Sequence, residues 1–341
     1  MRVEAVEGSG SAVWQQFTSN LLTLGVWTEK SAGRGEDAHP LVLHNWRTHR
    51  GLTAVFDGLG GAGAGRVGHA AGGVERSNAW VAAHGARGLV EEWFLDAHER
   101  TAAGDPAGLR DHLADRLAEL KGTGRRKILG TMRRELPTTF AGIAYEVGKT
   151  EVRWQALWAG DSRCYLLDPL AGLQQLTRDD TESDDALTLL VEDPPMTNVI
   201  SAGGQFVVNE NRGAVGMPCL FVTATDGFFG YLDTPAEFEH VLLDTLVASA
   251  DAADWGDRLA DRVASYTGDD ASLSVVAFGF ADFAWLREAF TRRARVVLVD
   301  HVEPVRHVAD DRDAFVAERA DSWRRYREHY EWRMPPRKDR S

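Results

Sequence analysis

Cysteine is scarce in this chain, with two residues among 341, Cys164 and Cys219. Each lies inside an apolar run of the kind that forms a strand. We therefore favour two buried thiols over a disulfide, which fits a reducing compartment, and we expect the protein to be cytoplasmic. Neither cysteine is followed six residues later by arginine, so a cysteine-dependent phosphatase is not expected.

Long apolar runs and an excess of positive charge are also missing. No apolar stretch approaches the ~20 residues that a membrane-spanning helix needs, so no membrane is expected as a partner. The first residues are acidic and polar and form no signal-peptide pattern. The net charge is −13. Because binding to a phosphate backbone requires a basic surface, nucleic acid is not expected as the main partner.

The chain instead has the composition of an ordinary globular protein, with 44% hydrophobic and 26% charged residues. Its apolar runs predict two batches of strands, and helical patterns separate the batches. The expected strands are 41–46, 51–57, 140–147, 151–159, 163–168, 205–209, 219–225 and 273–280. The expected helical regions are 67–94, 105–136 and 235–264.

The connections between the predicted strands indicate how they pair. Tight glycine turns follow 140–147 and 151–159, so these strands and 163–168 are predicted to form an antiparallel meander. Strands and helices do not alternate one for one along the chain. We therefore predict an α+β fold in which helices pack on antiparallel sheets, rather than a doubly wound parallel sheet.

The two ends differ from the middle of the chain. Residues 1–20 carry little pattern and are assigned to an N-terminal segment, and 21–280 to the main domain. Residues 281–341 are predicted to be a helical, basic appendage, with helices at 285–295 and 309–332 and a possible strand at 295–299. Aromatic residues alternate with arginines in its second helix, which favours docking on a partner or on the domain itself over nucleic-acid binding. An acidic stretch at 179–195 predicts an exposed flap.

Acidic residues stand where predicted strands begin or end. The strand 51–56 runs into Asp57-Gly58, and 219–225 runs into Asp226-Gly227. A single Asp-Gly commonly marks a plain turn. Further acids occupy equivalent places, and their recurrence favours a shared site. They are Glu36, Asp37, Asp161, Asp269 and Asp270.

A cluster of this kind needs a cation. Two unit charges ~4 Å apart repel by about 4 kcal/mol at an effective dielectric constant near 20. The candidate ligands are all oxygen donors, which selects Mg²⁺ or Mn²⁺ rather than Zn²⁺. Two such ions sharing a water would make a nucleophile at neutral pH, suited to attack on a phosphoryl group.

The glycine-rich segment 58–65 admits another interpretation, because it follows a strand and precedes a helical pattern. A dinucleotide loop, however, also requires a parallel βαβ unit and an acid about 20 residues further on, after a second strand. Glu75 and Glu91 do not occupy such a position, so nucleotide binding is disfavoured.

Taken together, the acidic blocks resemble those of the metal-dependent protein serine/threonine phosphatases of the PP2C type. The resemblance extends from about residue 23 to 280. Four blocks carry it: Gly35-Glu36-Asp37-Ala38; Val55-Phe56-Asp57-Gly58-Leu59-Gly60-Gly61; Ala159-Gly160-Asp161-Ser162-Arg163; and the late pair Thr225-Asp226-Gly227 with Asp269-Asp270-Ala271-Ser272.

The resemblance implies a four-layer α-β-β-α sandwich with a site for two Mn²⁺ or Mg²⁺ ions at one end. Asp57 would bridge the two ions, and the Gly58 carbonyl would bind one of them. Asp226 and Asp269 would bind the other, with Asp270 as the alternative to Asp269. Three further acids complete the implied set, Glu36 and Asp37 holding metal-bound waters and Asp161 belonging to a weaker third site.

The chain departs from the family at three positions. Leu59 stands where many eukaryotic members have a histidine proposed as a general acid. Ala32 replaces the usual phosphate-binding arginine, which leaves nearby Arg34 as the candidate. Gly230 replaces an acid that helps to hold the third metal.

The resemblance implies hydrolysis of phosphoserine and phosphothreonine on a phosphorylated protein, the product of a serine/threonine kinase. Asp57, Asp226 and Asp269 would act through metal-bound water, with no phospho-enzyme. The departures at Leu59, Ala32 and Gly230 support one alternative, a catalytically weak or inactive scaffold with the same fold that binds a partner protein.

Overall fold

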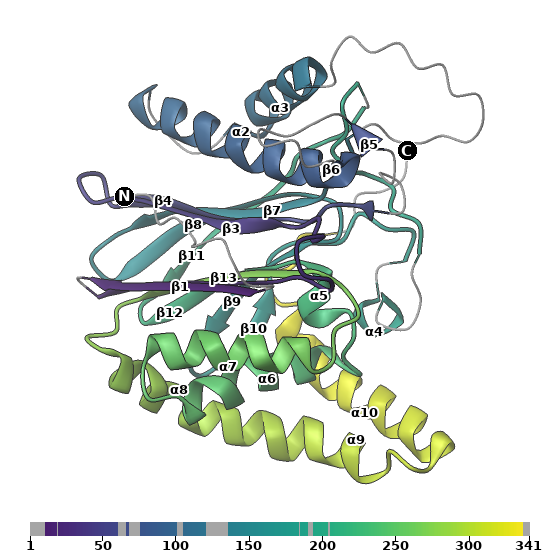
Figure 1. Cartoon of the computed structure of the whole chain (residues 1–341). Helices are drawn as coiled ribbons and strands as arrows, with labels where there is room; N and C mark the ends of the chain where they lie inside the picture. The colour runs from purple at the N-terminus through teal and green to yellow at the C-terminus, as the bar shows by residue number, and fades with distance from the viewer. Residues whose placement is uncertain are drawn as a thin grey trace.

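The computed structural model describes residues 11–18, 20–60, 66–67, 76–100, 105–120, 136–183, 185–189, 194–203 and 205–336. Two antiparallel sheets lie face to face, and helices cover the outer face of each sheet (Figure 1). The molecule therefore has four layers in the order α-β-β-α. This arrangement confirms the predicted fold class.

The first sheet has six strands. Their order is β1 (Ser11–Thr18), β2 (Leu21–Thr28), β13 (Ala271–Phe278), β12 (Cys219–Ala224), β9 (Arg163–Asp168) and β10 (Gly172–Gln175). Each neighbouring pair is antiparallel. The edge strand β1 pairs with β2 along its whole length, although residues 11–18 gave no strand signal in the sequence.

The second sheet has five strands. Their order is β11 (Asn209–Gly216), β8 (Glu151–Ala159), β7 (Phe140–Val147), β4 (Arg50–Phe56) and β3 (Ala38–Asn45). The predicted meander is wrong at one point, because β8 and β9 belong to different sheets and the turn at 160–162 crosses between them. The strand predicted at 205–209 begins only at Asn209.

Two helices cover the second sheet, α2 (Asn78–Arg100) and α3 (Pro106–Leu120), and α2 packs on β3 and β4. The predicted helix at 67–94 begins too early, since Val67 lies in a short ribbon of β5 (Arg66–Val67) and β6 (Arg76–Ser77). Residues 68–75, the loop positions 61–65 and the predicted helical stretch 121–135 lie outside the described residues.

The remaining helices lie on the side of the first sheet, except α4 in the flap (Figure 1). The predicted strand at 295–299 is wrong: helix α8 continues through these residues into a π-helical turn, which overrides the β-branched composition. These elements are α4 (Ala186–Leu189), α5 (Asp226–Phe229), α6 (Pro235–Ala248), α7 (Ala252–Ala264), α8 (Phe283–Val297), η1 (Leu298–Val302), α9 (Glu303–His307) and α10 (Arg312–Tyr330).

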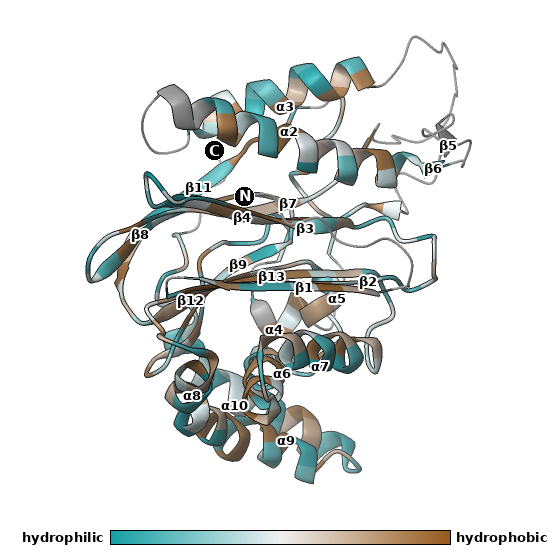
Figure 2. Cartoon of the chain, turned by 60° about the vertical axis from the view of Figure 1, so that its left-hand side comes forward, coloured by the Kyte–Doolittle hydropathy of each residue, from teal (hydrophilic) through white to brown (hydrophobic). Residues whose placement is uncertain are grey.

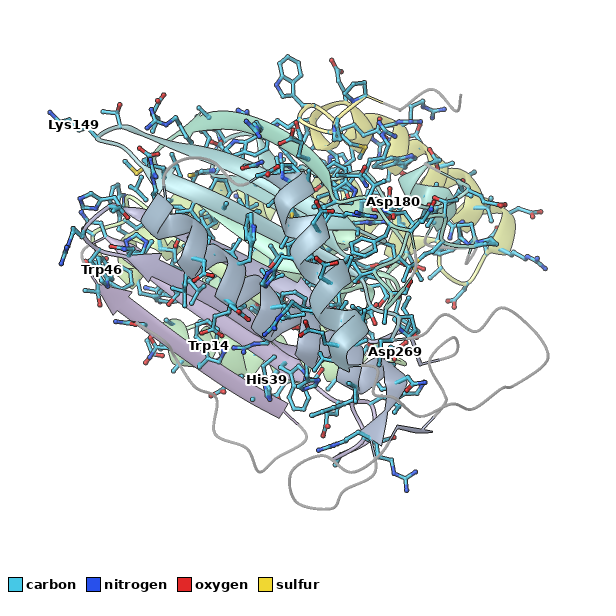
Figure 3. The ribbon with its side chains drawn as sticks, turned by 90° about the horizontal axis from the view of Figure 1, so that it is seen from above. Trp14, His39, Trp46, Lys149, Asp180 and Asp269 are labelled. Carbon is cyan, nitrogen blue, oxygen red and sulfur yellow. The ribbon has the colours of Figure 1, made fainter. Side chains whose placement is uncertain are left out.

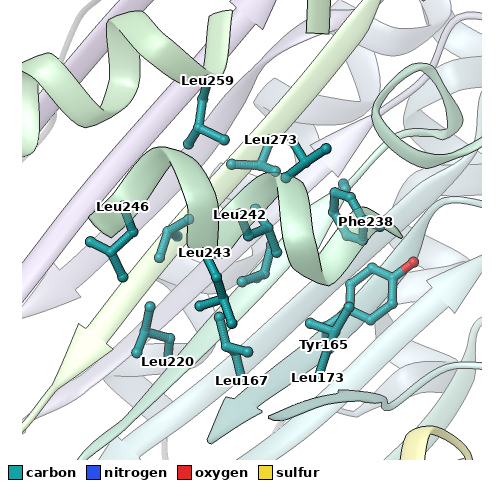
Figure 4. Close-up of a cluster of buried hydrophobic side chains, with 14 of the residues drawn as sticks. Tyr165, Leu167, Leu173, Leu220, Phe238, Leu242, Leu243, Leu246, Leu259 and Leu273 are labelled. Atoms are coloured by element: carbon teal, nitrogen blue, oxygen red, sulfur yellow. The ribbon is translucent and has the colours of Figure 1, made fainter. Parts of the chain in front are cut away.

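Apolar side chains fill the spaces between the layers. Leu242, Leu243 and Leu246 of α6 pack against Leu167 and Leu220 of the first sheet (Figure 4). The hydropathy colouring shows hydrophobic segments, in brown, on strands of both sheets and on the helices of both outer layers, alternating with hydrophilic segments in teal (Figure 2). Both predicted free thiols are confirmed, since Cys164 and Cys219 are unpaired and buried.

The C-terminal helices pack on the domain itself. Trp323, Tyr326 and Tyr330 of α10 are buried in the same core as the first sheet. Of the two docking roles predicted for these aromatic residues, the structure therefore supports packing on the domain itself. The predicted domain boundaries near residues 20 and 280 stay predictions. None of the helices described is long and apolar enough to span a membrane.

Candidate metal centre

The predicted acidic residues come from loops at one end of the sandwich. Asp57 follows β4, Asp226 opens α5 one residue beyond the end of β12, and Asp161 lies in the turn between β8 and β9. The pairs 36–37 and 269–270 immediately precede β3 and β13. Seen from above, Asp269 lies at one end of the molecule, and the hairpin residues Trp46 and Lys149 lie at the other (Figure 3).

Asp37 lies at the centre of a hydrogen-bonded group. Its side chain is buried, with 2% of the residue exposed. One carboxylate oxygen accepts a hydrogen bond from the Gly58 N–H at 3.3 Å, and the other accepts from Thr225 Oγ1 at 2.9 Å. Thr225 Oγ1 in turn accepts from the Ser272 N–H at 2.8 Å. Asp37 therefore ties together loops from both sheets.

The backbone around Asp57 is fixed from the neighbouring strand. The Asp57 carbonyl oxygen accepts hydrogen bonds from Thr138 Oγ1 at 2.6 Å and from the Thr139 N–H at 3.0 Å. Gly58 lies so close to the Glu36 backbone that a Cβ would come within 2.5 Å of its carbonyl oxygen. This close approach requires glycine, and it brings the two acidic loops together.

The two late aspartates have different surroundings. Asp270 accepts hydrogen bonds from the Lys30 N–H at 2.8 Å and from the Glu36 N–H at 2.6 Å. Asp269 is exposed, and its carboxylate accepts from the Asp270 N–H at 2.9 Å. Asp270 thus fixes the position of the Glu36 loop, while Asp269 has the more accessible carboxylate.

Asp161 occupies the turn that crosses between the sheets. The turn depends on Gly160, whose φ of 109° is a left-handed conformation that favours glycine. Asp180 holds this turn, since its carboxylate accepts from the Gly160 N–H at 3.0 Å and its own N–H donates to the Gly160 carbonyl at 3.0 Å. Asp161 Oδ1 is buried and has no hydrogen-bond partner.

Burial and mutual repulsion perturb these carboxyl groups. Burial raises the pKa of Asp57 well above its ordinary value, and the charges of Asp37, Asp226 and Asp161 raise it further. Burial likewise raises the pKa of Asp37, to which Asp270 and Asp226 add. Asp37 and Asp57 thus lie close enough to act on each other's protonation.

The chemistry of these residues suits a hard divalent cation. The donors are all oxygen, the Asp161 oxygen lacks a partner, and the carboxyls disfavour one another's charge. They do not form a closed cage, because no three His, Cys, Asp or Glu side chains of the described residues are spaced to hold a metal ion.

The other positions singled out in the sequence lie at the edge of this cluster. Arg34 is exposed. The Leu59 N–H donates to the Pro137 carbonyl at 3.4 Å, and the Gly230 N–H donates to the Asp226 carbonyl at 2.6 Å, closing the single turn of α5.

Thr225 and Asp180 were not predicted from the sequence, although both organise the site. Thr225 directly precedes Asp226 and could have been found as a hydrogen-bonding residue next to a candidate ligand. Asp180 lies within an acidic run whose composition predicts only a flap.

Comparison with known proteins supports the fold. No family model matches the chain, and no curated protein matches it. A bacterial serine phosphatase aligns over 80% of this chain and 98% of its own, with 16% identity and a TM-score of 0.50. A bacterial serine phosphatase that carries an arginine-to-lysine substitution aligns over the same shares, with 16% identity and a TM-score of 0.51. The chain therefore has the fold of the bacterial PP2C-type serine/threonine phosphatases, as its motifs implied.

Proposed function

We propose that the protein is a metal-dependent protein serine/threonine phosphatase. One observation carries the proposal: acidic residues far apart in the sequence meet at one end of the sandwich, where they are buried enough to raise one another's pKa. A fold shared with serine/threonine phosphatases adds to it. The substrate would be a phosphoserine or phosphothreonine protein produced by a kinase, and the cytoplasm remains the expected location.

The proposed ligands follow from the cluster. Asp57 would bridge two Mn²⁺ or Mg²⁺ ions, the Gly58 carbonyl would bind one, and Asp226 with Asp269 or Asp270 would bind the other. The remaining acids complete the set, namely Glu36 and Asp37 through waters and Asp161 at a weaker third position. When bound, the ions supply an activated water and neutralise the charge of the phosphoryl group.

The residues of the chain define what surrounds that chemistry. Thr225 orients Asp37, and the Thr138 and Thr139 donors fix the backbone of Asp57. Leu59 has no proton to give to a leaving alkoxide, so protonation of the leaving group falls to water. We therefore expect an aryl phosphate, whose leaving group needs no proton, to react faster than a phosphoserine peptide.

The experiment measures hydrolysis of p-nitrophenyl phosphate and of a phosphothreonine peptide with added Mn²⁺. Asp57→Asn and Asp226→Asn should each abolish hydrolysis. Glu151→Gln changes an exposed acid in the hairpin at the opposite end and should leave the rate unchanged. Full activity in the presence of a strong chelator would contradict the mechanism.

A scaffold that binds a partner protein is the second candidate. The open arrangement of the carboxylates in the described residues favours it, together with Leu59, Ala32 and Gly230. Calorimetric titration with Mn²⁺ separates the two, because a phosphatase must bind the ion and a scaffold need not. An absence of binding near millimolar Mn²⁺ would favour the scaffold.

A further inference from the structure

One arginine near the carboxylate cluster makes few hydrogen bonds with the residues that the structure describes. Arg76 Nη1 donates to the Gly33 carbonyl oxygen at 3.2 Å. Its guanidinium carbon lies 4.6 Å from the centroid of the Trp80 ring. Its Nε is buried and has no hydrogen-bond partner. With the residues that the structure describes, Arg76 forms no ion pair.

The contacts of Arg76 place it beside the proposed metal ligands. Burial raises the pKa of the Glu36 carboxyl group, and the next residue, Ser77, lies close enough to that group to lower its pKa in part. Gly33, which accepts from Arg76, lies three residues before Glu36 on the same loop. The guanidinium is therefore held between the loop that leads to Glu36 and the first turn of α2.

The other positive charges at this end, among the side chains that the structure describes, are paired or exposed. Arg163 is buried in a bidentate pair with Asp179, at 2.7 to 3.0 Å. The charge of Lys30 acts on the Asp269 carboxylate. Arg34 is exposed. Among the arginine side chains that the structure describes at this end, Arg76 is thus the one whose unpartnered Nε and position both suit an anion near the cluster.

The geometry of a guanidinium matches a phosphoryl group. Arginine presents five N–H donors in a planar fork, and two of them can bind two phosphoryl oxygens at once. The Trp80 ring on one face limits the orientations of this fork and removes part of its water. A buried N–H without an acceptor also favours an incoming oxygen.

We propose that Arg76 binds the phosphoryl oxygens of the substrate through its unused N–H groups. The inference rests on the proposed phosphatase function and names a substrate-binding residue for it. A dianionic phosphoryl group approaching several carboxylates is repelled by them, and the fixed positive charge of Arg76 would offset part of this repulsion. Because Arg76 would contact the substrate and hold no metal, it should affect phosphate affinity and leave metal affinity unchanged.

The test compares wild-type protein with Arg76→Ala and Arg76→Lys, each with saturating Mn²⁺. We expect Arg76→Ala to raise KM for p-nitrophenyl phosphate and the inhibition constant of inorganic phosphate by at least ten-fold. Arg76→Lys keeps the charge but loses the fork, so an intermediate effect is expected. Calorimetric titration should give the same Mn²⁺ affinity for all three proteins. Arg47→Ala, an exposed arginine in the hairpin at the far end, is the matched control.

Measuring the direct binding of inorganic phosphate to the Mn²⁺-treated protein tests the role of Arg76 independently of the proposed phosphatase activity. If the wild type hydrolyses nothing but binds phosphate, and Arg76→Ala loses that binding, the function fails and the inference stands. Phosphate binding and KM unchanged in a folded Arg76→Ala protein would overturn it, as would wild-type protein that binds no phosphate. A loss found in Arg34→Ala instead would also overturn it. Should Arg76→Ala not fold, the phosphate affinity of Arg76→Lys decides between the same outcomes.

Discussion

A buried ion pair joins the C-terminal helices to the domain, and we predict that it is essential for stability. Glu239 of α6 is fully buried, and its carboxylate accepts two hydrogen bonds from Arg293 of α8, at 2.7 and 2.8 Å. Tyr326 of α10 donates to the same carboxylate at 2.5 Å. His329 contacts the Arg293 guanidinium at 3.0 Å. One carboxylate thus organises three helices.

Glu239→Gln keeps the shape of the side chain but leaves Arg293 without its counter-charge. Breaking a buried pair in this way costs about 3–5 kcal/mol, because the remaining charge has lost water and gained no partner. At roughly 2 °C per kcal/mol, a value suited to a large domain, Tm should fall by about 6–10 °C. Calorimetric melting of the full chain measures this change.

Two further variants make the reasoning refutable. Replacing both partners, Glu239→Leu with Arg293→Met, removes the stranded charge and should recover most of the lost stability. Arg306→Gln removes a surface ion pair with Glu237 in which the Arg306 side chain is 45% exposed. Loss of this pair should lower the free energy of unfolding by less than about 1 kcal/mol. If Glu239→Gln melts within about 2 °C of wild type, or the double variant is no more stable than Glu239→Gln alone, the ion pair does not have this role.

Three other outcomes are expected. With a chelator present, Asp57→Asn should have a higher Tm than the wild type, because one of the mutually repelling carboxylates is gone. Added Mn²⁺ should raise the Tm of the wild type but not that of Asp57→Asn. Burial and the charge of Arg293 lower the pKa of His329 to about 4, so the free energy of unfolding should fall as the pH drops below about 6.5, the pKa of an unfolded histidine. His329→Gln does not titrate, so between about pH 7.5 and pH 5 its free energy of unfolding should fall by about 1–2 kcal/mol less than that of the wild type. Ser274→Ala strands two buried threonine hydroxyls between the sheets and should cost about 1–3 kcal/mol in denaturant unfolding.

Local signals in the sequence predict much of the fold. The strands β7, β8 and β9 begin and end at the predicted residues, because apolar runs bounded by glycine turns are strong strand signals. Local signals do not predict the sheet to which a strand belongs. The turn at Gly160 has the composition of a hairpin turn, but it leads β9 to β12 in the opposite sheet. Only the pairing of distant strands distinguishes the two outcomes.

The candidate site, too, could be predicted from the sequence only in part. Each acidic residue could be nominated from the sequence because it stands where a strand begins or ends. The sequence could not give the roles of Asp269 and Asp270, since the contact of Asp270 with the Glu36 backbone spans 234 residues. Arg76 was missed for a similar reason: its place beside Gly33 depends on the short β5–β6 ribbon, which carries almost no sequence signal.

The C-terminal residues contribute to the support of the site although none of them is a candidate ligand. Arg333 donates to the Gln174 side chain in β10, an edge strand of the first sheet, and to the Ala214 carbonyl in β11, an edge strand of the second sheet. The residue after Gln174 donates to Asp179 at 3.2 Å, and Asp179 holds Arg163, two residues from Asp161. A short chain of polar contacts therefore runs from the end of α10 to the turn that carries Asp161. Arg333 helps to fix the edge between the sheets, so the geometry of the Asp161 turn depends on residues that no motif would identify.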